Sequence, residues 1–280
     1  MGFLKPDASL ELFVGDPLVC LTICCLIILG GIGFIVTVDL YNWGRKRVRK
    51  EERRPHLTLH TRIVLVSTAS LLVLGTVLTL GLEYDHTLKD LNFWEKLNAS
   101  FFQSVTARTA GYATIPQGEL GDATKLVTII LMFIGASPSS TGGGIKTTTF
   151  VVLVATVVSI SRGRDETVIN KRRVDKSVVY RAMTIVAMAF LVIAITSGVI
   201  MVTTPPEVSA IDAVYEAVSA FGTVGLTTGL TPDLSIVAKI LVMLTMFIGR
   251  VGPISLVLAL TMKHSGGPGK ILPEGKVIVG

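Results

Sequence analysis

Two short loops share the pattern Thr-x-Gly, a combination that suits the binding of a partly dehydrated cation. They are Thr109-Ala-Gly-Tyr112 and Thr223-Val-Gly-Leu226. A cation that leaves water must exchange its hydration shell for other oxygens, and backbone carbonyls supply these without a fixed charge that would trap the ion. Glycine permits the unusual dihedrals that aim several carbonyls at one axis, and a threonine hydroxyl adds an oxygen. We therefore predict ion-binding backbone at Thr109, Ala110, Gly111, Tyr112, Thr223, Val224, Gly225 and Leu226.

The two loops occupy equivalent positions of an internal repeat. A shift of 114 residues aligns Ala99–Gly135 with Ala213–Gly249 without a gap, and ten of the 37 aligned residues are identical. The identities include the threonine and glycine of both loops and the run Met-Phe-Ile-Gly that ends each segment. Repeats in membrane proteins commonly place a permeation path at their interface. Thr-x-Gly by itself is common in protein loops. Its recurrence at equivalent positions of a repeat is what indicates a shared function for these two loops.

The composition places these loops in a membrane. Hydrophobic residues make up 50% of the 280 residues and charged residues only 16%, whereas soluble domains carry about 25% charged residues. The mean hydropathy is +0.66. The net charge is +6, but the basic residues cluster in two short links, Arg45–Arg62 and Arg162–Arg181. Such links are typical of cytoplasmic loops, so we expect a lipid bilayer, and not nucleic acid, around the chain.

Apolar segments of suitable length predict the helices that hold the loops. The first apolar segment has 22 residues, and a helix of that length spans about 33 Å, enough for a hydrocarbon core of about 30 Å. With the basic links in the cytoplasm, the links 83–122 and 205–233 lie on the outer side of the membrane. Each contains an apolar stretch, too short to cross the membrane, that precedes a Thr-x-Gly loop. We therefore predict re-entrant helices there, which enter and leave the membrane on the same side. The predicted spans are Pro17–Val38, Ile63–Leu82, Ala182–Thr204 and Leu234–Met262, and the re-entrant helices are Phe93–Thr106 and Ala210–Phe221.

The segment Ala123–Ser161 is too long for one straight span. Its 39 residues would form a helix of about 58 Å. Its centre holds Pro138 and the triple glycine that ends at Gly144, and both features break helices. Non-helical backbone at membrane depth survives only where protein or water satisfies its polar groups. We therefore predict a broken helix whose unwound centre borders an aqueous cavity.

Four stretches together resemble the Trk/Ktr/HKT superfamily of potassium transporters, and most closely its bacterial membrane (pore) subunit. The stretches are Val105–Tyr112, Ser137–Thr148, Ser219–Leu226 and Phe247–Pro253, and the resemblance covers about residues 15–263. It implies an all-α membrane protein with repeated helix–pore loop–helix units, four of which surround one pseudo-fourfold pore. It further implies potassium (monovalent cation) uptake through a multi-pass protein of the plasma membrane, with no cofactor. The implied partners are a second copy, in a homodimer, and a cytosolic nucleotide-binding regulatory subunit.

The resemblance also implies an intramembrane gating loop beneath the filter, with Arg250 as part of the gate. In the repeat, Arg250 corresponds to Ala136 inside the broken segment, so its side chain would project toward the same cavity floor. An alternative is that Arg250 only ties down carbonyls of the broken helix, and Lys146 could instead extend to the cytoplasmic surface. The gating residues implied by the resemblance are Ser137, Gly142, Gly143, Gly144, Lys146 and Arg250.

The chain accounts for two and a half of the four units. Residues 1–62 would hold the closing transmembrane helix of an incomplete unit and a basic cytoplasmic loop. Residues 63–177 would form a complete pore unit with the broken gating helix, and residues 178–280 a second complete unit with the arginine-containing last helix and a cytoplasmic tail. Two filter loops do not close a fourfold site. We therefore expect a truncated product or C-terminal fragment, or a further chain that supplies the missing units.

Other classes of function fit the sequence less well. The glycine-rich segment lacks the Gly-Lys-Ser/Thr of a phosphate loop, because Ile145 separates Gly144 from Lys146. A nucleophilic Ser137 or Ser139 would need a base, and all four histidines lie outside the predicted spans, so we do not expect an enzyme. Two alternatives stay open. One is a coupled cation secondary transporter, for which intramembrane carboxylates are typical, and the other is a truncated, non-conducting family remnant.

Overall fold

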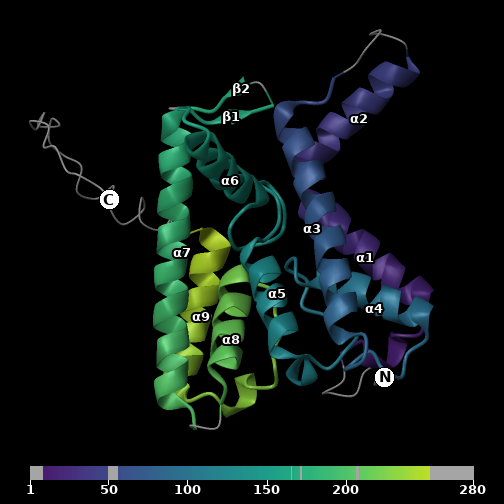
Figure 1. Ribbon diagram of the computed structural model, residues 1–280, viewed down its shortest axis with the longest axis vertical. Helices are drawn as coiled ribbons and strands as arrows, with labels where there is room; N and C mark the ends of the chain where they lie inside the picture. Colours follow the sequence, from purple (N-terminus) through teal and green to yellow (C-terminus); the bar gives the residue numbers. More distant parts are fainter. Residues whose placement is uncertain (1–8, 50–55, 165, 171, 206–207, 253–280) are drawn as a thin grey trace, which may run out of the picture.

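The computed structural model describes residues 9–49, 56–164, 166–170, 172–205 and 208–252, and its regular structure is almost entirely helical (Figure 1). The helices are α1 (Pro17–Ile32), α2 (Phe34–Val48), α3 (Leu59–Glu83), α4 (Phe93–Thr106), α5 (Asp122–Phe133), α6 (Thr147–Ser161), α7 (Lys176–Thr203), α8 (Ala210–Gly222) and α9 (Ile236–Val251). Short 3₁₀ turns are η1 (Glu11–Phe13), η2 (Gln117–Glu119) and η3 (Thr231–Asp233). An antiparallel hairpin of β1 (Val168–Ile169) and β2 (Arg172–Arg173) joins α6 to α7, with Val168 opposite Arg173.

The helices form two similar units, as the internal repeat predicts. In the first unit, α4 packs against α3 and also against α1. In the second, α8 packs against α7 and α9, and it also contacts α5 of the first unit. The second unit occupies the left of Figure 1 and helices α1, α3 and α4 the right, with α5 between them. The predicted bounds of the two short helices are confirmed to within one residue, because α4 has the predicted ends and α8 ends at Gly222 instead of Phe221.

Side-chain caps determine where several helices begin. At α4, the Asn92 N–H donates to Glu95 Oε2 (2.9 Å) within a capping box. At α7, Asp175 Oδ1 accepts from the Ser177 N–H (2.8 Å), and at α9, Ser235 Oγ accepts from the N–H three residues on (3.2 Å). Each cap satisfies an N–H without an intrahelical partner and typically contributes about 1 kcal/mol. Of these helices, α4 leads directly into the first Thr-x-Gly loop, so its capping box fixes where that helix begins.

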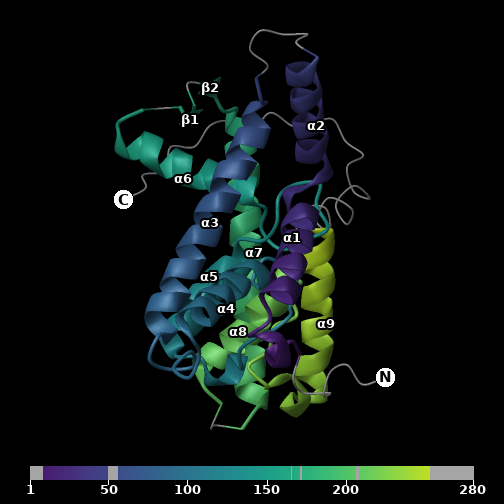
Figure 2. The same ribbon diagram turned by 90° about the vertical axis from the view of Figure 1, so that its right-hand side faces the viewer.

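The two basic links lie at one end of the molecule, and the outer links 83–122 and 205–233 lie at the other. Helix α2, whose last turn carries Arg45, Lys46 and Arg47, reaches the same end as the β1–β2 hairpin in both views (Figures 1 and 2). The connections from α3 to α4 and from α7 to α8 lie at the other end. This arrangement agrees with the prediction that the two basic links share one side of the membrane.

The first predicted span, Pro17–Val38, is wrong as a straight helix. The chain bends by 96° between α1 and α2, at Gly33, where φ is +89°. The Phe34 N–H donates to the Ser139 carbonyl (3.0 Å), and a Cβ at Gly33 would overlap the carbonyl oxygen of Pro138. The bend therefore follows from contact with a distant part of the chain, which hydropathy along α1 does not reveal.

The predicted break in Ala123–Ser161 is confirmed. Helix α5 ends at Phe133 and α6 begins at Thr147, and residues 134–146 between them are called the intramembrane segment below. Ile134 and Ile145 pair through a parallel bridge, so the two ends of the segment lie side by side and run in the same direction. The span predicted as Leu234–Met262 begins as α9 at Ile236, and its predicted end lies outside the described residues.

The outer faces of the helices are apolar, and some of the contacts between the helices are polar. Helices α3 and α7 are long and apolar enough to cross a membrane, and the bent pair α1–α2 is a third candidate by length and composition. Between α7 and α9, Thr196 Oγ1 and Thr245 Oγ1 lie 2.7 Å apart. In lipid, close packing and such hydrogen bonds hold helices together. Exposed large apolar side chains on α3, α7 and α9 include Val73, Val77, Phe190, Leu191, Ile240 and Met243.

Gly75 allows α3 and α4 to pack closely. A Cβ at this position would overlap the Ser104 hydroxyl and lie 2.8 Å from Leu131 Cδ1. We expect Gly75→Val to lower the free energy of unfolding by about 1–3 kcal/mol, the usual cost of overpacking. Thermal unfolding of the purified protein in detergent measures this loss. The control is Gly81→Val on the same helix, where a Cβ would meet no described atom within 4 Å. Equal losses in the two variants would contradict the packing argument.

Candidate ion pathway

The Thr-x-Gly loops follow the C-terminal ends of α4 and α8 and share one backbone geometry. They are called the first loop (Thr109–Tyr112) and the second loop (Thr223–Leu226). In the first loop, φ is +73° at its threonine and +79° at its glycine, and in the second the values are +52° and +92°. The residue between threonine and glycine is not left-handed in either loop. In each loop a residue without a positive φ thus lies between two residues with a positive φ. A positive φ is costly for a threonine.

The structure brings the two loops side by side. A Cβ at Gly111 would overlap the Val224 carbonyl oxygen and lie 3.1 Å from the Cα of Gly225. A Cβ at Gly225 would in turn lie 3.8 Å from the Cα of Gly111. The backbones of the two loops are thus in direct contact, and only glycine fits at the first of these positions.

The intramembrane segment packs against the threonines of both loops. The Gly143 N–H donates to Thr223 Oγ1 (3.1 Å), and a Cβ at Gly143 would overlap that side chain. A Cβ at Gly142 would lie 2.5 Å from Thr109 Oγ1. The Gly144 N–H donates to the Gly249 carbonyl of α9 (3.3 Å). The run of three glycines therefore lets the segment approach the loops more closely than any side chain would allow.

Both predicted cationic residues bind carbonyls of this segment. Arg250 Nη1 donates to the Thr141 carbonyl, and Lys146 Nζ donates to the Gly142 carbonyl. The contact of Arg250 matches the interpretation in which it ties down carbonyls of the broken helix. Lys146 folds back onto its own segment and does not extend to the cytoplasmic surface. The predicted Ser137 lies at the start of the segment, where its hydroxyl is 3.2 Å from Thr147 Oγ1.

Helix α1 holds the segment from a further side. The Ser137 N–H donates to the Gly31 carbonyl (3.1 Å), and the Thr141 N–H donates to the Gly30 carbonyl (3.5 Å). A cavity of about 520 Å³ lies alongside, and its lining includes Thr109, Tyr112 and the segment's Thr141. The first loop therefore has open space beside it, in agreement with the predicted cavity.

A buried polar network links α4, the turn η2 and α8, and the sequence analysis missed it. Gln103 of α4 and Gln117 exchange two hydrogen bonds (2.7 and 3.1 Å), and the Tyr215 hydroxyl of α8 donates to Gln117 Oε1 (2.9 Å). In the second unit, the Thr231 hydroxyl donates to the buried Glu216 (3.2 Å). Gln117 and Thr231 are equivalent in the repeat. A comparison of polar residues at equivalent positions would have found this pair.

A family model described as "TrkH: Cation transport protein" matches residues 1–267. The chain belongs to this family. Its members are cation transport proteins, which agrees with the expectation that the chain is not an enzyme.

Individual relatives of this TrkH-family chain have names that refer to potassium. It is 38% identical to the Ktr system potassium uptake protein B of Bacillus subtilis, over 100% of the chain and 60% of that protein. It is also 38% identical to the potassium/sodium uptake protein NtpJ of Enterococcus hirae, over 93% of the chain and 57% of that protein. The chain thus spans little more than half the length of these relatives.

A solved structure supports the fold. The potassium transporter TrkH from Vibrio parahaemolyticus matches with a TM-score of 0.69 and 20% sequence identity, covering 94% of the chain and 56% of the solved chain. This likeness confirms the all-α membrane fold with repeated units, and again the chain corresponds to about half of the larger structure.

Gln117 is the shared partner in the network beside the loops. We expect Gln117→Leu to lower the free energy of unfolding by about 1–3 kcal/mol, because the buried amide of Gln103 loses its partner. Thermal unfolding in detergent measures the loss. The double variant Gln103→Leu/Gln117→Leu removes both amides and should cost less than the sum of the single variants. Strictly additive losses would mean that the two side chains do not depend on each other.

Proposed function

We propose that the chain takes part in the uptake of potassium, a monovalent cation, across the plasma membrane. The observation that carries this proposal is the side-by-side contact of two loops with the same alternating backbone. Peptide oxygens arranged in this way replace the hydration shell of potassium without trapping the ion. The names of the Bacillus subtilis and Enterococcus hirae relatives support the choice of ion.

In this proposal the first and second loops form part of the selectivity filter. Their eight residues supply carbonyl oxygens, and the hydroxyls of Thr109 and Thr223 lie at the end of the filter next to the intramembrane segment. Helices α4 and α8 both direct their C-terminal ends at the loops. The partial negative charge of a helix C-terminus favours a cation there. Binding then requires no carboxylate in the pore.

We further propose that the intramembrane segment is the gate. It contacts both loop threonines, so an ion that leaves the filter on this side meets it first. To open the path, the segment must give up the bond from Gly143 to Thr223 and the contact between Thr141 and Arg250. Gly142, Gly144, Lys146 and Ser137 hold its closed form through the contacts described above. The gating role of Arg250 is thus to stabilise the closed arrangement.

The assembly around the chain is also a proposal. Two loops make half of a fourfold filter, and the division into residues 1–62, 63–177 and 178–280 leaves one and a half units to be supplied. We propose a multi-pass orientation with the basic links in the cytoplasm. A second copy and a cytosolic nucleotide-binding subunit are the proposed partners. The alternative is that this chain, which spans 60% of the Bacillus subtilis relative, does not conduct by itself.

Rubidium uptake into liposomes that contain the purified chain tests conduction directly. Uptake above that of empty liposomes would mean that copies of the chain complete a filter among themselves, and its absence would support the alternative in which the chain by itself does not conduct. Within this assay we expect Gly225→Ser to lower the preference for potassium over sodium about tenfold, equivalent to about 1.4 kcal/mol. The reason is that φ at Gly225 is +92°, which a serine adopts only with strain.

A matched control for this variant is Gly229→Ser. Gly229 also has a positive φ (+99°), but it lies outside the loop and its Cβ would meet no described atom within 4 Å. The control should keep the wild-type ion preference. An unchanged ratio of potassium to sodium in Gly225→Ser would remove this residue from the filter.

Arg250→Ala tests the gate. Because the variant loses the contact that holds Thr141, we expect uptake under resting conditions to rise several-fold, measured as rubidium flux at equal protein content. The matched control is Lys239→Ala, since Lys239 also lies on α9 and also donates to a carbonyl, that of Pro232 (2.9 Å). Unchanged flux in a folded Arg250→Ala protein would contradict the gating role.

A further inference from the structure

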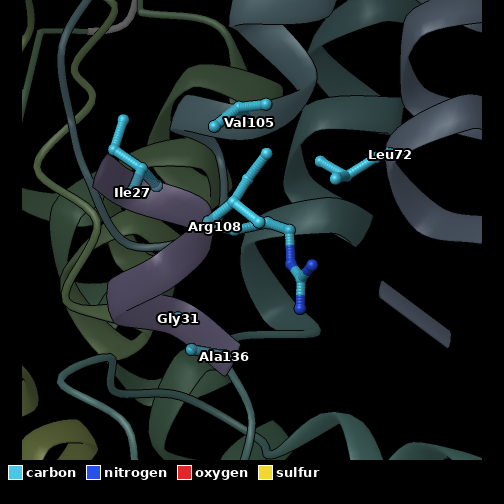
Figure 3. Close-up of a pocket in the computed structure, with 7 residues that line it drawn as sticks. Ile27, Gly31, Leu72, Val105, Arg108 and Ala136 are labelled. Atoms are coloured by element: carbon cyan, nitrogen blue, oxygen red, sulfur yellow. The ribbon is translucent and has the colours of Figure 1, made fainter. Parts of the chain in front are cut away.

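Arg108 is a buried cation that the proposed pathway does not use. It lies between the end of α4 and the first loop, immediately before Thr109, and only 7% of its surface is exposed. In Figure 3 the side chain starts between residues of α1, α3 and α4, and its guanidinium points away from them, on the side where Ala136 of the intramembrane segment lies. The side chain therefore lies beside the first loop at membrane depth.

One edge of the guanidinium has no hydrogen-bond partner among the described residues. The two atoms concerned are Nε and Nη2, and both are buried. These two N–H groups are adjacent and form the fork with which arginine binds an anion through two parallel hydrogen bonds. The other residues that line the adjoining cavity carry no charge: Ile27, Ile28, Gly31, Leu72, Val105 and Ala136. The fork is thus an anion-binding group in apolar surroundings.

The repeat does not require this charge. The equivalent of Arg108 in the second unit is Gly222, where a Cβ would lie 2.8 Å from the Met132 carbonyl oxygen. The two units therefore place their loops by the same helix ends, but only the first unit carries a cation there. The arginine is an addition to one unit, and its charge must be compensated locally.

Compensation is needed on two grounds. A buried charge without a partner is costly in a medium of low dielectric constant. In addition, a fixed positive charge beside Thr109 repels a cation in the first loop, and this repulsion is strong where water is excluded. A bound anion offsets both penalties at once, whereas a neutral hydrogen-bond acceptor offsets part of the first and leaves the repulsion unchanged.

The cavity restricts the size and kind of ligand. Its volume is about 10 Å³, which is close to the space for a single water-sized particle. A water there could accept two hydrogen bonds from the fork, which meets the minimum of two polar partners, but it would leave the charge of the guanidinium without a counter-charge. A polyatomic anion such as phosphate is too large. The cavity of about 520 Å³ shares Ile27, Gly31 and Arg108 with it and reaches the first loop, so the larger cavity lies next to the small one.

We propose that the Nε and Nη2 edge of Arg108 binds one monatomic anion, a halide such as chloride, behind the first loop. The anion neutralises the guanidinium and so lowers the repulsion on a cation in that loop. The binding part of this inference is independent of ion uptake, whereas its effect on uptake rests on the proposed function.

Halide binding is tested by thermal unfolding of the purified chain in detergent. At equal ionic strength, the wild-type midpoint should be higher by about 2 °C or more in potassium chloride or bromide than in potassium gluconate. Arg108→Gln should abolish this difference, and Arg162→Gln, which changes an exposed arginine, should keep it. Arg108→Lys retains the charge without the fork, so it should lose most of the difference between halide and gluconate. It replaces Arg108→Gln in this test if the glutamine variant does not fold. Equal wild-type midpoints in all three salts, or a halide effect that persists in the Arg108 variants, would overturn the proposal.

Rubidium uptake tests the electrostatic role. The wild-type chain in liposomes should take up rubidium several-fold faster in chloride than in gluconate, and Arg108→Gln should show the same rate in both. If the wild-type chain takes up no rubidium with either anion, the proposed function fails, while the thermal midpoints still decide whether Arg108 binds a halide. Anion-independent uptake by the wild type would overturn the role of the anion beside the loop.

Discussion

Backbone N–H and C=O groups that leave a helix inside a membrane must find partners, and this requirement organises the centre of the molecule. The intramembrane segment meets it by bonding in three directions. It donates to carbonyls of α1, to the hydroxyl of Thr223 and to the Gly249 carbonyl of α9. Two cationic side chains bind its own carbonyls. Because the same segment touches α1, α9 and both loops, its position determines theirs.

The need for close backbone approach also explains residues that the two units share. The run Met-Phe-Ile-Gly ends with Gly135 in the first unit and Gly249 in the second. A Cβ at Gly135 would overlap the Gly143 carbonyl oxygen, and one at Gly249 would overlap the Phe221 carbonyl oxygen. In both units the glycine lets one backbone lie directly on another, next to the loops. The repeat thus preserves a contact between backbones as well as a pattern of helices.

The sequence predicted those features that depend on neighbouring residues. The ends of α4 and the break around Pro138 follow from local apolar runs and helix breakers, and the two loops were found from the repeated pattern. The bend at Gly33 could not be predicted, because hydropathy is continuous across it and its cause, Ser139, is distant in the chain. The isolation of Arg108 likewise depends on three helices that meet only in the fold. Part of the network of Gln117 could have been predicted from the sequence, since Gln117 and Thr231 are polar residues at equivalent positions of the repeat.

The hydroxyl of Thr223 serves two neighbours, and this has a thermodynamic consequence. Its oxygen accepts a hydrogen bond from the Gly143 N–H, and the same oxygen faces the end of the proposed filter. In the proposed filter, an ion bound to this oxygen and the Gly143 N–H draw on the lone pairs of the same atom, so each weakens the binding of the other. By reciprocity, whatever strengthens the bond to Gly143 lowers the affinity for the ion, and a higher ion concentration loosens the segment. In the proposed function, this shared oxygen therefore couples the binding of an ion in the filter to the release of the intramembrane segment.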